Sequence, residues 1–452
     1  MSKTRQSKPH KTKILDTKWA DVHQTRGGRR TIELELWLFL VLVGMALVLV
    51  VALWSVERGR AVRLTVKDVD SLREALPSIA GATHGTLLDG NRVEVLQNGD
   101  GFFPRLLADV AAAKETIHVE SYVWWKGEIC RRVAEALAER ARAGVEVRVL
   151  LDASGSMKMD RDLLKLMRDA GAEVRKYRPP RPSNLGRMNR RDHRKIAVID
   201  GRVGYVFGHG FAQEWTGHAQ DREHWRDTGA RVLGPIVGGL QSAFAENWTE
   251  ETGEVLVGPK FFPPLRPEGH VLAHLAYYFD HGSVSSVDLL YRLAFASARR
   301  ELWIQNPYLA PDSDVLELLS KAADRGVDVR VMLPGEITDA QIVRHAGHAW
   351  YDTLLAHGVR ICEYQRTLNH QKIVIVDGVW SHIGSTNLDN RSFATNDEIS
   401  LGIMDEAVAG ELRGAFVRDL EVCKPIELRE WRQRSALHKL RDWASYRAND
   451  QL

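Results

Sequence analysis

The feature that most constrains the fold is an internal duplication between residues 116 and 378. In the first copy, a strand pattern at 116–120 precedes a helical pattern at 128–143, then Gly144 and a strand pattern at 145–151. In the second copy, a strand pattern at 302–305 precedes a helical pattern at 313–325, then Gly326 and a strand pattern at 327–333. Glycine after a helical pattern is typical of a helix end. The order predicts two α/β halves, each a mixed β-sheet flanked by helices, that share one central cleft.

Each copy ends in the same short motif, H-x-K-x4-D, within an apolar strand pattern. The motif residues are His193, Lys195 and Asp200 in the first copy and His370, Lys372 and Asp377 in the second. Residues i and i+2 of a strand point to one face, so the histidine and lysine of each motif are expected to project together. The aspartate has the opposite parity and opens an Asp-Gly turn, which predicts a hairpin and a bracing role.

Two histidines beside two lysines suit phosphodiester chemistry. A neutral imidazole can attack phosphorus while a second, protonated imidazole protonates the leaving alkoxide. The ammonium groups would hold the non-bridging oxygens, so neither a metal nor a cofactor is expected for the reaction. Asp227 follows the first motif histidine by 34 residues and Glu398 follows the second by 28. Each acid is a candidate to accept a histidine ring N–H, or it is a surface carboxylate.

The segments after the two motifs differ. After the second motif, Ser385 and Asn387 offer a hydroxyl and an amide to phosphate oxygens. At the matching place in the first copy stand His209 and Phe211. His209 either replaces the missing phosphate donor or only packs.

Residues 36–54 form an uncharged run of nineteen residues, close to the ~20 needed for a transmembrane helix. The alternative is a cleaved signal peptide, but no A-x-A-like cleavage site follows. Nine basic residues precede the run and five lie in residues 55–75. This bias predicts a single-pass protein of the cell (inner) membrane, with its N-terminus in the cytoplasm and its body on the extracytoplasmic side.

The charge distribution argues against a nucleic-acid-binding body. Residues 1–30 hold nine basic and two acidic residues, so residues 31–452 carry a formal charge of about −4. An arginine-rich segment at 178–194 is either a grip for anionic headgroups or a solvated charge run. His345 and His348 have a spacing that can bind a metal, but no third ligand completes the set in the sequence, so packing is preferred.

The paired motifs resemble the phospholipase D superfamily over residues 90–430. The stretch 214–228, with Gly234-Pro235 and the amphipathic pattern at 240–248, is similar to the bacterial cardiolipin synthase branch. That resemblance implies a phosphatidyltransferase that makes cardiolipin from phosphatidylglycerol and releases glycerol. It also implies His193 as nucleophile and His370 as general acid, an assignment that the near symmetry of the halves makes reversible. The alternatives are a phospholipase D that forms phosphatidic acid, a phosphodiesterase or nuclease, and an inactive scaffold, which two intact motifs disfavour.

The predicted domain organisation follows from these features. The expected partners are phospholipid substrates and a membrane, without nucleic acid, and the oligomeric state is not predicted. The segments are a basic N-terminal segment (1–35), a transmembrane helix (36–54), a juxtamembrane connector (55–90), half 1 (91–260), half 2 (270–430) and a C-terminal tail (431–452).

Overall fold

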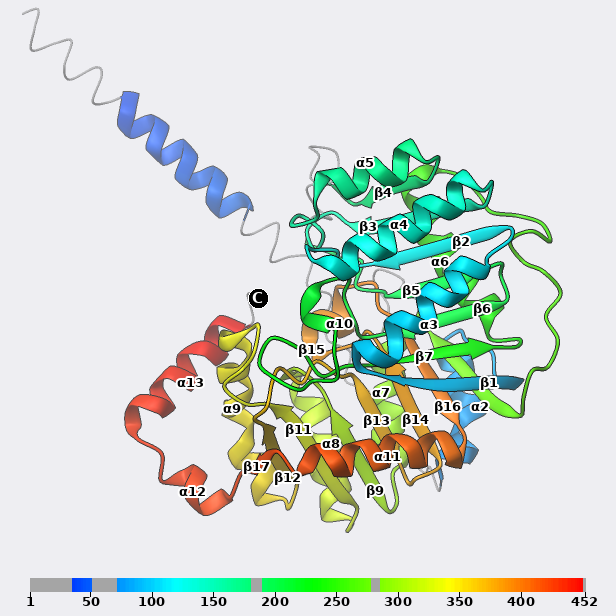
Figure 1. Ribbon diagram of the computed structural model, residues 1–452. Coiled ribbons are helices and arrows are strands. Elements are labelled where there is room, and N and C mark those ends of the chain that lie inside the picture. The colour runs from blue at the N-terminus through cyan, green and yellow to red at the C-terminus, as the bar shows by residue number, and fades with distance from the viewer. Residues whose placement is uncertain (1–34, 51–70, 180–188, 278–284, 450–452) are drawn as a thin grey trace, which may run out of the picture. The chain divides into compact units, whose positions relative to one another are not determined.

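One long sheet of fifteen strands runs through the described body, and its second half repeats the strand order of the first (Figure 1). The computed structural model describes residues 35–50, 71–179, 189–277 and 285–449. The first-half order is β1-β7-β6-β5-β2-β3-β4, and the second-half order is β8-β16-β14-β13-β9-β11-β12, with β17 added at the edge. The predicted duplication is therefore confirmed at the level of topology.

The strands and helices of the two halves correspond in chain order. The strands of half 1 are β1 (Leu88–Gln97), β2 (Thr116–Ser121), β3 (Glu146–Asp152), β4 (Glu173–Tyr177), β5 (Ile196–Ile199), β6 (Val203–Phe207) and β7 (Thr228–Leu233). Those of half 2 are β8 (Val271–Ala276), β9 (Glu301–Gln305), β11 (Asp328–Pro334), β12 (Arg360–Tyr364), β13 (Ile373–Val376), β14 (Trp380–Gly384), β16 (Ser400–Met404) and β17 (Cys423–Pro425). The larger helices are α3 (Asn98–Ala112), α4 (Glu128–Arg142), α5 (Arg161–Asp169) and α6 (Val237–Thr252), then α7 (Ser286–Ser297), α8 (Ser313–Asp324), α9 (Gln341–Ala356) and α11 (Glu406–Leu420).

Both faces of the sheet are covered, which explains the continuous apolar runs of the central strands. In β5, Ala197 and Ile199 pack in one core cluster with α3 and α4, whereas Ile196 and Val198 pack in another with α6. The residues of β13 alternate in the same way, between a cluster with α7 and α8 and the cluster that contains α11. Helices therefore pack against both faces of the central strands and hold them in position.

The two halves join edge to edge through an antiparallel pairing of β1 with β8. The register shifts between Leu88 and Asn91, and Gly90 there has a φ of 83°. The buried Asn91 side chain donates to the backbone oxygen of Val271, 3.0 Å away, across the irregularity. A β-bulge of this kind bends the sheet where the halves meet.

The predicted Asp-Gly hairpins are confirmed in both halves. β5 pairs antiparallel with β6, and β13 pairs with β14. Asp200 and Asp377 open the turns with φ angles of 52° and 54°. Aspartate and glycine accept this left-handed region more readily than most residues.

The N-terminal part contains two helices. Residues 35–50 are helical and exposed, and the rest of the predicted span, 51–54, lies outside the described residues. Among the described residues, no helix combines the length and apolar character needed to cross a membrane. The segment predicted as a connector, 55–90, contains helix α2 (Leu72–Ala82), whose Leu76 and Ile79 are buried in the core of half 2 with α7 and α8.

Candidate active site

The motif histidines and lysines lie just before their strands, which corrects the prediction that they lie within them. β5 begins at Ile196 and β13 at Ile373, so each H-x-K segment is an extended lead-in. The backbone of each H-x-K segment pairs instead with a segment of the opposite half. The backbone N–H of His193 donates to the backbone oxygen of Asp397 at 2.8 Å. The backbone N–H of His370 donates to the backbone oxygen of Arg226 at 2.8 Å.

The backbone pairing sets the partner of each imidazole. His193 Nδ1 lies 2.9 and 3.0 Å from the carboxylate oxygens of Glu398, which follows Asp397 in half 2. His370 Nδ1 lies 2.7 Å from Asp227 Oδ2 in half 1. Chain order had placed each acid with the histidine that precedes it, and the structure exchanges the two pairs. Each carboxylate accepts the Nδ1–H of the histidine from the other half, which leaves Nε2 as the reactive nitrogen.

The two carboxyl groups have different environments. Burial raises the pKa of Glu398 to about 7, against the opposing charge of Lys195. Burial also disfavours ionisation of Asp227, but the neighbouring imidazoles and the Lys372 ammonium outweigh it and lower its pKa. The Asp227 carboxylate also accepts from the indole of Trp215 at 2.9 Å. Asp227 is therefore an ionised partner at neutral pH, whereas Glu398 titrates near neutrality.

The two histidines differ in the same sense. Burial lowers the pKa of His193 well below its ordinary value, and the charges of Lys195 and Lys372 lower it further. Burial and Lys372 also lower the pKa of His370, but the Asp227 carboxylate opposes them. Neutral imidazole is thus favoured at His193, and the imidazolium is better supported at His370.

The two motif lysines are buried and are suited to bind an anion. Both are 1% exposed, and neither has a carboxylate ion-pair partner among the described residues. Lys195 Nζ donates to the oxygen of His193 at 2.8 Å, and Lys372 Nζ lies 2.9 Å from His370 Nδ1. Burial lowers the pKa of Lys195 to about 7 and that of Lys372 to about 8. A bound phosphate would supply the missing counter-charge.

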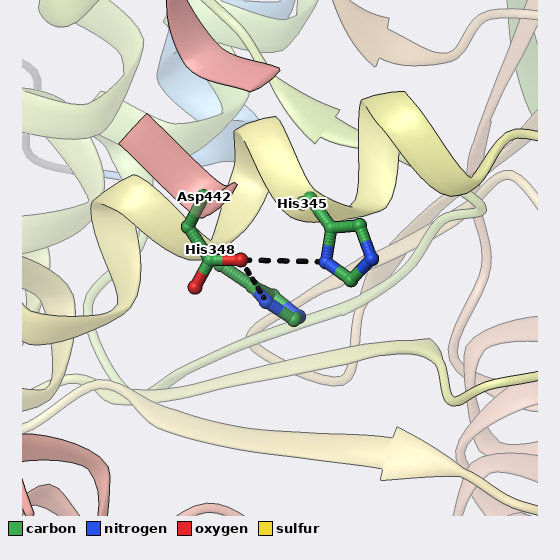
Figure 2. A group of neighbouring side chains, drawn as sticks. All are labelled: His345, His348 and Asp442. Atoms are coloured by element: carbon green, nitrogen blue, oxygen red, sulfur yellow. Dashed lines mark hydrogen bonds and ion pairs between the residues drawn. The ribbon is translucent and has the colours of Figure 1, made fainter. Parts of the chain in front are cut away.

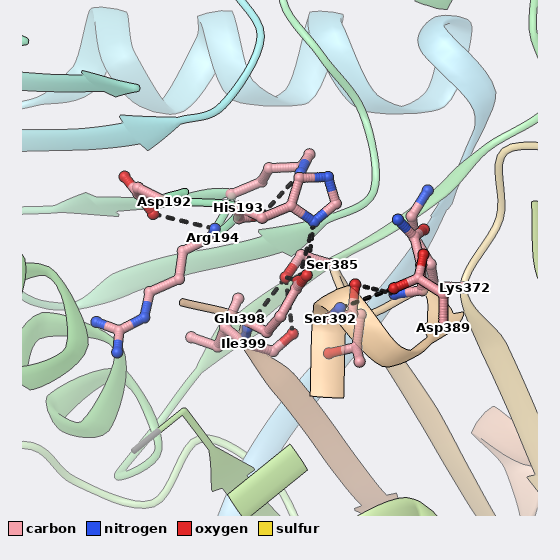
Figure 3. A network of polar contacts seen from close by, with 12 residues as sticks. Asp192, His193, Arg194, Lys372, Ser385, Asp389, Ser392, Glu398 and Ile399 are labelled. Atoms are coloured by element: carbon pink, nitrogen blue, oxygen red, sulfur yellow. Dashed lines mark hydrogen bonds and ion pairs between the residues drawn. The ribbon is translucent and has the colours of Figure 1, made fainter. Parts of the chain in front are cut away.

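Ser385, predicted to contact phosphate, is committed to Glu398. Its hydroxyl donates to the Glu398 carboxylate and accepts the N–H of Ile399 at 3.0 Å (Figure 3). Ser385 is fully buried. Asn387 is 7% exposed, and its side-chain oxygen has no hydrogen-bond partner within the described chain. That oxygen can only accept a hydrogen bond, so the phosphate donor predicted at Asn387 would be its side-chain NH₂ group.

His209 lies at the place of Ser385 in half 1 but in apolar surroundings. Its ring stacks on Phe102 with centroids 4.6 Å apart and planes 10° apart. Neither ring nitrogen has a hydrogen-bond partner in the part of the chain that the structure describes, and burial lowers its pKa to about 4. The neighbouring Gly208 cannot be larger, because a Cβ there would lie 2.3 Å from Asp227 Oδ1.

Asp200 and Asp377 brace the entry of the neighbouring strands, as their parity suggested. The Asp200 carboxylate accepts the N–H groups of Lys114, Glu115 and Thr116 at 2.7–3.1 Å. Asp377 does the same for the three residues 299–301 before and at the start of β9. Both lie at the turn end of the hairpin, at the opposite end of the strand from the histidine.

The walls of the site are aromatic, and the sequence left Trp125, Trp215 and Trp225 open between lining a lipid entry and core packing, which it favoured. Tyr122 meets His193 edge-on at 5.0 Å between ring centroids, and Trp215 meets His370 at 5.1 Å. Trp225 lies 6.0 Å from His370. Trp125, in ring contact with Trp215, lines a cavity of about 550 Å³ together with Lys126, Met157, Met159 and Lys158. Trp215 was visible in the stretch 214–228, but nothing in the sequence distinguished it from a core residue.

Two arginines of the arginine-rich segment fit neither of the alternatives, a headgroup grip or a solvated charge run. Arg178 is buried against Glu250 and Asp397, and Arg194 is buried against Glu246 and two backbone oxygens. These two side chains stabilise the fold. Residues 180–188, with Arg181 and Arg187, lie outside the described residues.

A third side chain, which the sequence did not indicate, accompanies His345 and His348. Asp442, from helix α13 (Ala436–Asn449), lies against both imidazoles. No local pattern indicates this residue, because it lies 94 positions after His348.

Comparison with known proteins identifies the repeated body. A family model described as cardiolipin synthase, PLD-like domain, matches residues 106–221 and 291–420. A cardiolipin synthase of Geobacillus sp. (strain WCH70) is 35% identical over 352 residues, covering 75% of this chain and 68% of the relative. Cardiolipin synthase A of Pseudomonas syringae is 34% identical over 389 residues, covering 86% and 80%. The major cardiolipin synthase of Bacillus subtilis is 32% identical over 366 residues, covering 80% and 76%.

Solved structures share the fold at lower sequence identity. The phosphatidylserine synthase of Haemophilus influenzae Rd KW20 superposes with a TM-score of 0.61 at 12% identity, covering 84% of this chain and 98% of that one. The polyphosphate kinase of Porphyromonas gingivalis superposes with a TM-score of 0.51 at 13% identity, covering 86% and 56%. At these identities the likeness concerns the fold alone.

Proposed function

The chain belongs to the cardiolipin synthase family with a phospholipase-D-like domain, and on that premise we propose that it is a phosphatidyltransferase that joins two phosphatidylglycerol molecules into cardiolipin and releases glycerol. The observation that carries the proposal is the exchange of acids between two unequal histidines. One imidazole is kept neutral beside a carboxyl that titrates near pH 7, and the other is paired with an ionised carboxylate. A two-step transfer through a covalent phosphohistidine needs this difference.

In the first step, His193 Nε2 attacks the phosphorus of the donor phosphatidylglycerol. The bond from phosphorus to the glycerol headgroup breaks as the P–N bond forms, and the imidazolium of His370 gives its Nε2 proton to the leaving alkoxide. Glu398 accepts the Nδ1–H of His193 and supports the positive charge that develops on its ring. Lys195 and Lys372 stabilise the negative charge on the non-bridging oxygens.

In the second step, the roles at His370 reverse. Its imidazole, now neutral, takes the proton from a hydroxyl of a second phosphatidylglycerol. The hydroxyl oxygen attacks phosphorus, the P–N bond breaks, and cardiolipin leaves with His193 neutral again. Asp227 keeps the Nδ1–H of His370 in place during both proton transfers. Ser385 acts as a positioning residue for Glu398.

The product distinguishes transfer from hydrolysis. In a bacterial host without cardiolipin synthases, expression of the chain is expected to produce a four-chain phospholipid by mass spectrometry, with glycerol released in equal amount by the purified enzyme. A His357→Ala variant, changed at an exposed histidine paired with Asp324, is the control and should make the same lipid. Accumulation of phosphatidic acid alone would establish a phospholipase D instead.

We also propose that residues 36–54 are a single membrane anchor with the body on the extracytoplasmic side, and that the two halves span residues 91–260 and 270–430, with helix α2 packed on half 2. The uncharged run and the excess of basic residues before it support this arrangement. Protease added to intact spheroplasts is expected to cleave an epitope tag at the C-terminus and to spare one at the N-terminus.

A further inference from the structure

A cluster outside the site described above joins helix α13 to helix α9. His345 and His348 lie on successive turns of α9, and Asp442 reaches them from α13 (Figure 2). Among the described residues, this is the one group of three histidine, cysteine or acidic side chains with the spacing of a metal site. One atom from each member lies within 4.8 Å of one atom from the others.

The distances between the three side chains are long for hydrogen bonds, although His348 Nδ1 and Asp442 Oδ1 are within hydrogen-bond reach, and they also fit a shared cation. His345 Nδ1 and His348 Nδ1 each lie 3.3 Å from Asp442 Oδ1. A charge-assisted N–H···O bond is shorter, about 2.7–2.9 Å. Ligand atoms about 2.0–2.1 Å from a tetrahedral zinc ion lie about 3.3–3.4 Å from one another. The two nitrogen–oxygen distances therefore match the edges of a tetrahedral site.

The hydrogen bonds around the cluster leave three acceptors facing one another. His348 faces a carboxylate at each ring nitrogen, because Nε2 lies 3.2 Å from Glu363 Oε1 on β12 and Nδ1 lies 3.3 Å from Asp442 Oδ1. In the tautomer that donates its Nε2–H to Glu363, Nδ1 is an acceptor and can bind a cation. The outward hydrogen bond of a metal-bound histidine commonly ends on a carboxylate in this way. His345 Nδ1 is buried without a hydrogen-bond partner in the described structure. Arg434 donates a hydrogen bond to Asp442 Oδ2, so Oδ1 remains to face the imidazoles.

The packing of α13 also needs an explanation. Asp442 is 3% exposed, whereas Leu437 and Trp443 on the same helix are 74% and 56% exposed. The helix therefore buries a carboxylate against α9 and leaves large apolar side chains outside. Arg434 pairs with one oxygen of this carboxylate, and a metal ion would compensate the charge that faces the two imidazoles.

The geometry points to a structural zinc site in which His345, His348 and Asp442 bind one Zn²⁺ and fasten the C-terminal helix α13 to α9. Two imidazoles and one carboxylate favour a borderline transition ion over Mg²⁺ or Ca²⁺, which prefer oxygen ligands. Arg441 Nε lies 3.8 Å from Asp442 Oδ1, but its side chain is 49% exposed and is free to move towards solvent. Solvent would complete the fourth position, because the His345 side chain is 12% exposed.

The test measures zinc itself. The full-length protein, stripped with a chelator and dialysed against Zn²⁺, is expected to retain a single equivalent by elemental analysis and to show a higher Tm with Zn²⁺ than without it. With Co²⁺ it should show the visible absorption bands of a tetrahedral ion. Glu363→Gln is expected to weaken zinc binding roughly 10- to 100-fold, because it removes the outward partner of a ligand.

Matched variants decide whether these residues are the ligands. His345→Ala and Asp442→Asn should lose the bound zinc and the Tm increase, whereas His438→Ala, at an exposed histidine on α13, should keep both. His345 is only partly buried, so its variant remains informative if Asp442→Asn unfolds the helix. The proposal is overturned if the wild-type protein binds no more zinc than His345→Ala, whether both bind it or neither does.

Discussion

At the residue scale, the difference between the two histidines lies in their surroundings. Both are nearly buried and both donate Nδ1–H to a carboxylate. Glu398 has a serine hydroxyl as its second donor, while Asp227 has an indole N–H and the amide of Thr228. Glycine at 208, as at 384 in half 2, leaves space for the acid, because a Cβ at 208 would lie 2.3 Å from Asp227 Oδ1. Burial lowers the pKa of both imidazoles, but the Asp227 carboxylate opposes this decrease at His370.

The buried lysines predict the alkaline side of the pH profile. Burial lowers the folded-state pKa of Lys195 to about 7 and of Lys372 to about 8, so the free enzyme loses both positive charges as the pH rises through this range. We expect kcat/KM to fall over the same range, because it reports the free enzyme. The decline in kcat should occur at higher pH, since bound phosphate raises both lysine pKa values. Steady-state rates on phosphatidylglycerol vesicles measure both curves, and a flat kcat/KM profile between pH 7 and 8 would be incompatible with this account.

At the element scale, the hairpin turns hold neighbouring strands together at the end of the sheet away from the histidines. The motif aspartates sit at the turns, and their carboxylates bind the backbone N–H groups that open β2 and β9. The helices, central strands and hairpins were predictable from local patterns of glycine, apolar alternation and Asp-Gly. The true start of β5 and β13 was not, because the residues before them pair with the other half rather than with a neighbouring strand.

Removing the Asp200 carboxylate should lower the stability of the protein but not its catalytic activity. Asp200→Ala leaves three backbone N–H groups without their acceptor, so we expect a loss of about 1–3 kcal/mol in the free energy of unfolding. Residual activity of the folded fraction should stay close to wild type. Asp169→Ala, which removes only an exposed ion pair with Lys165, should change stability by less than about 1 kcal/mol. Denaturant unfolding followed by activity assays compares the two, and equal stability losses would refute the bracing role.

At the scale of the whole molecule, the site exists only because the halves are joined. Each half supplies a histidine and a lysine from one segment and the acid for the opposite histidine from another. The sequence predicted the shared cleft and all the residues of the two pairs. It could not predict the exchange, because residues more than 140 positions apart are aligned by a backbone contact between halves that no local pattern encodes. For the same reason, the sequence did not predict that Asp442 lies beside His345 and His348.

The exchanged pairing has an energetic signature. In a double-mutant cycle on kcat/KM, Asp227→Asn and His370→Ala should couple by at least about 1 kcal/mol, because each removes the other's partner. The same cycle should be measured for each acid with the histidine of its own half. These pairs are Asp227→Asn with His193→Ala and Glu398→Gln with His370→Ala. Near-additive effects are expected for Asp227 with His193, and strong coupling there would favour the pairing suggested by chain order.

The central claim is that His193 carries the phosphatidyl group and His370 moves the proton, and trapping the intermediate tests it most directly. The substrate is a phosphatidyl ester of an acidic phenol, whose departure needs no general acid. With His370→Ala, the phosphatidyl group should accumulate on the peptide that contains His193, because no base remains to activate the acceptor. With His193→Ala, mass spectrometry should find no adduct. An adduct on His370 in the His193→Ala protein would contradict the assignment, and the absence of any adduct in both would contradict the covalent mechanism.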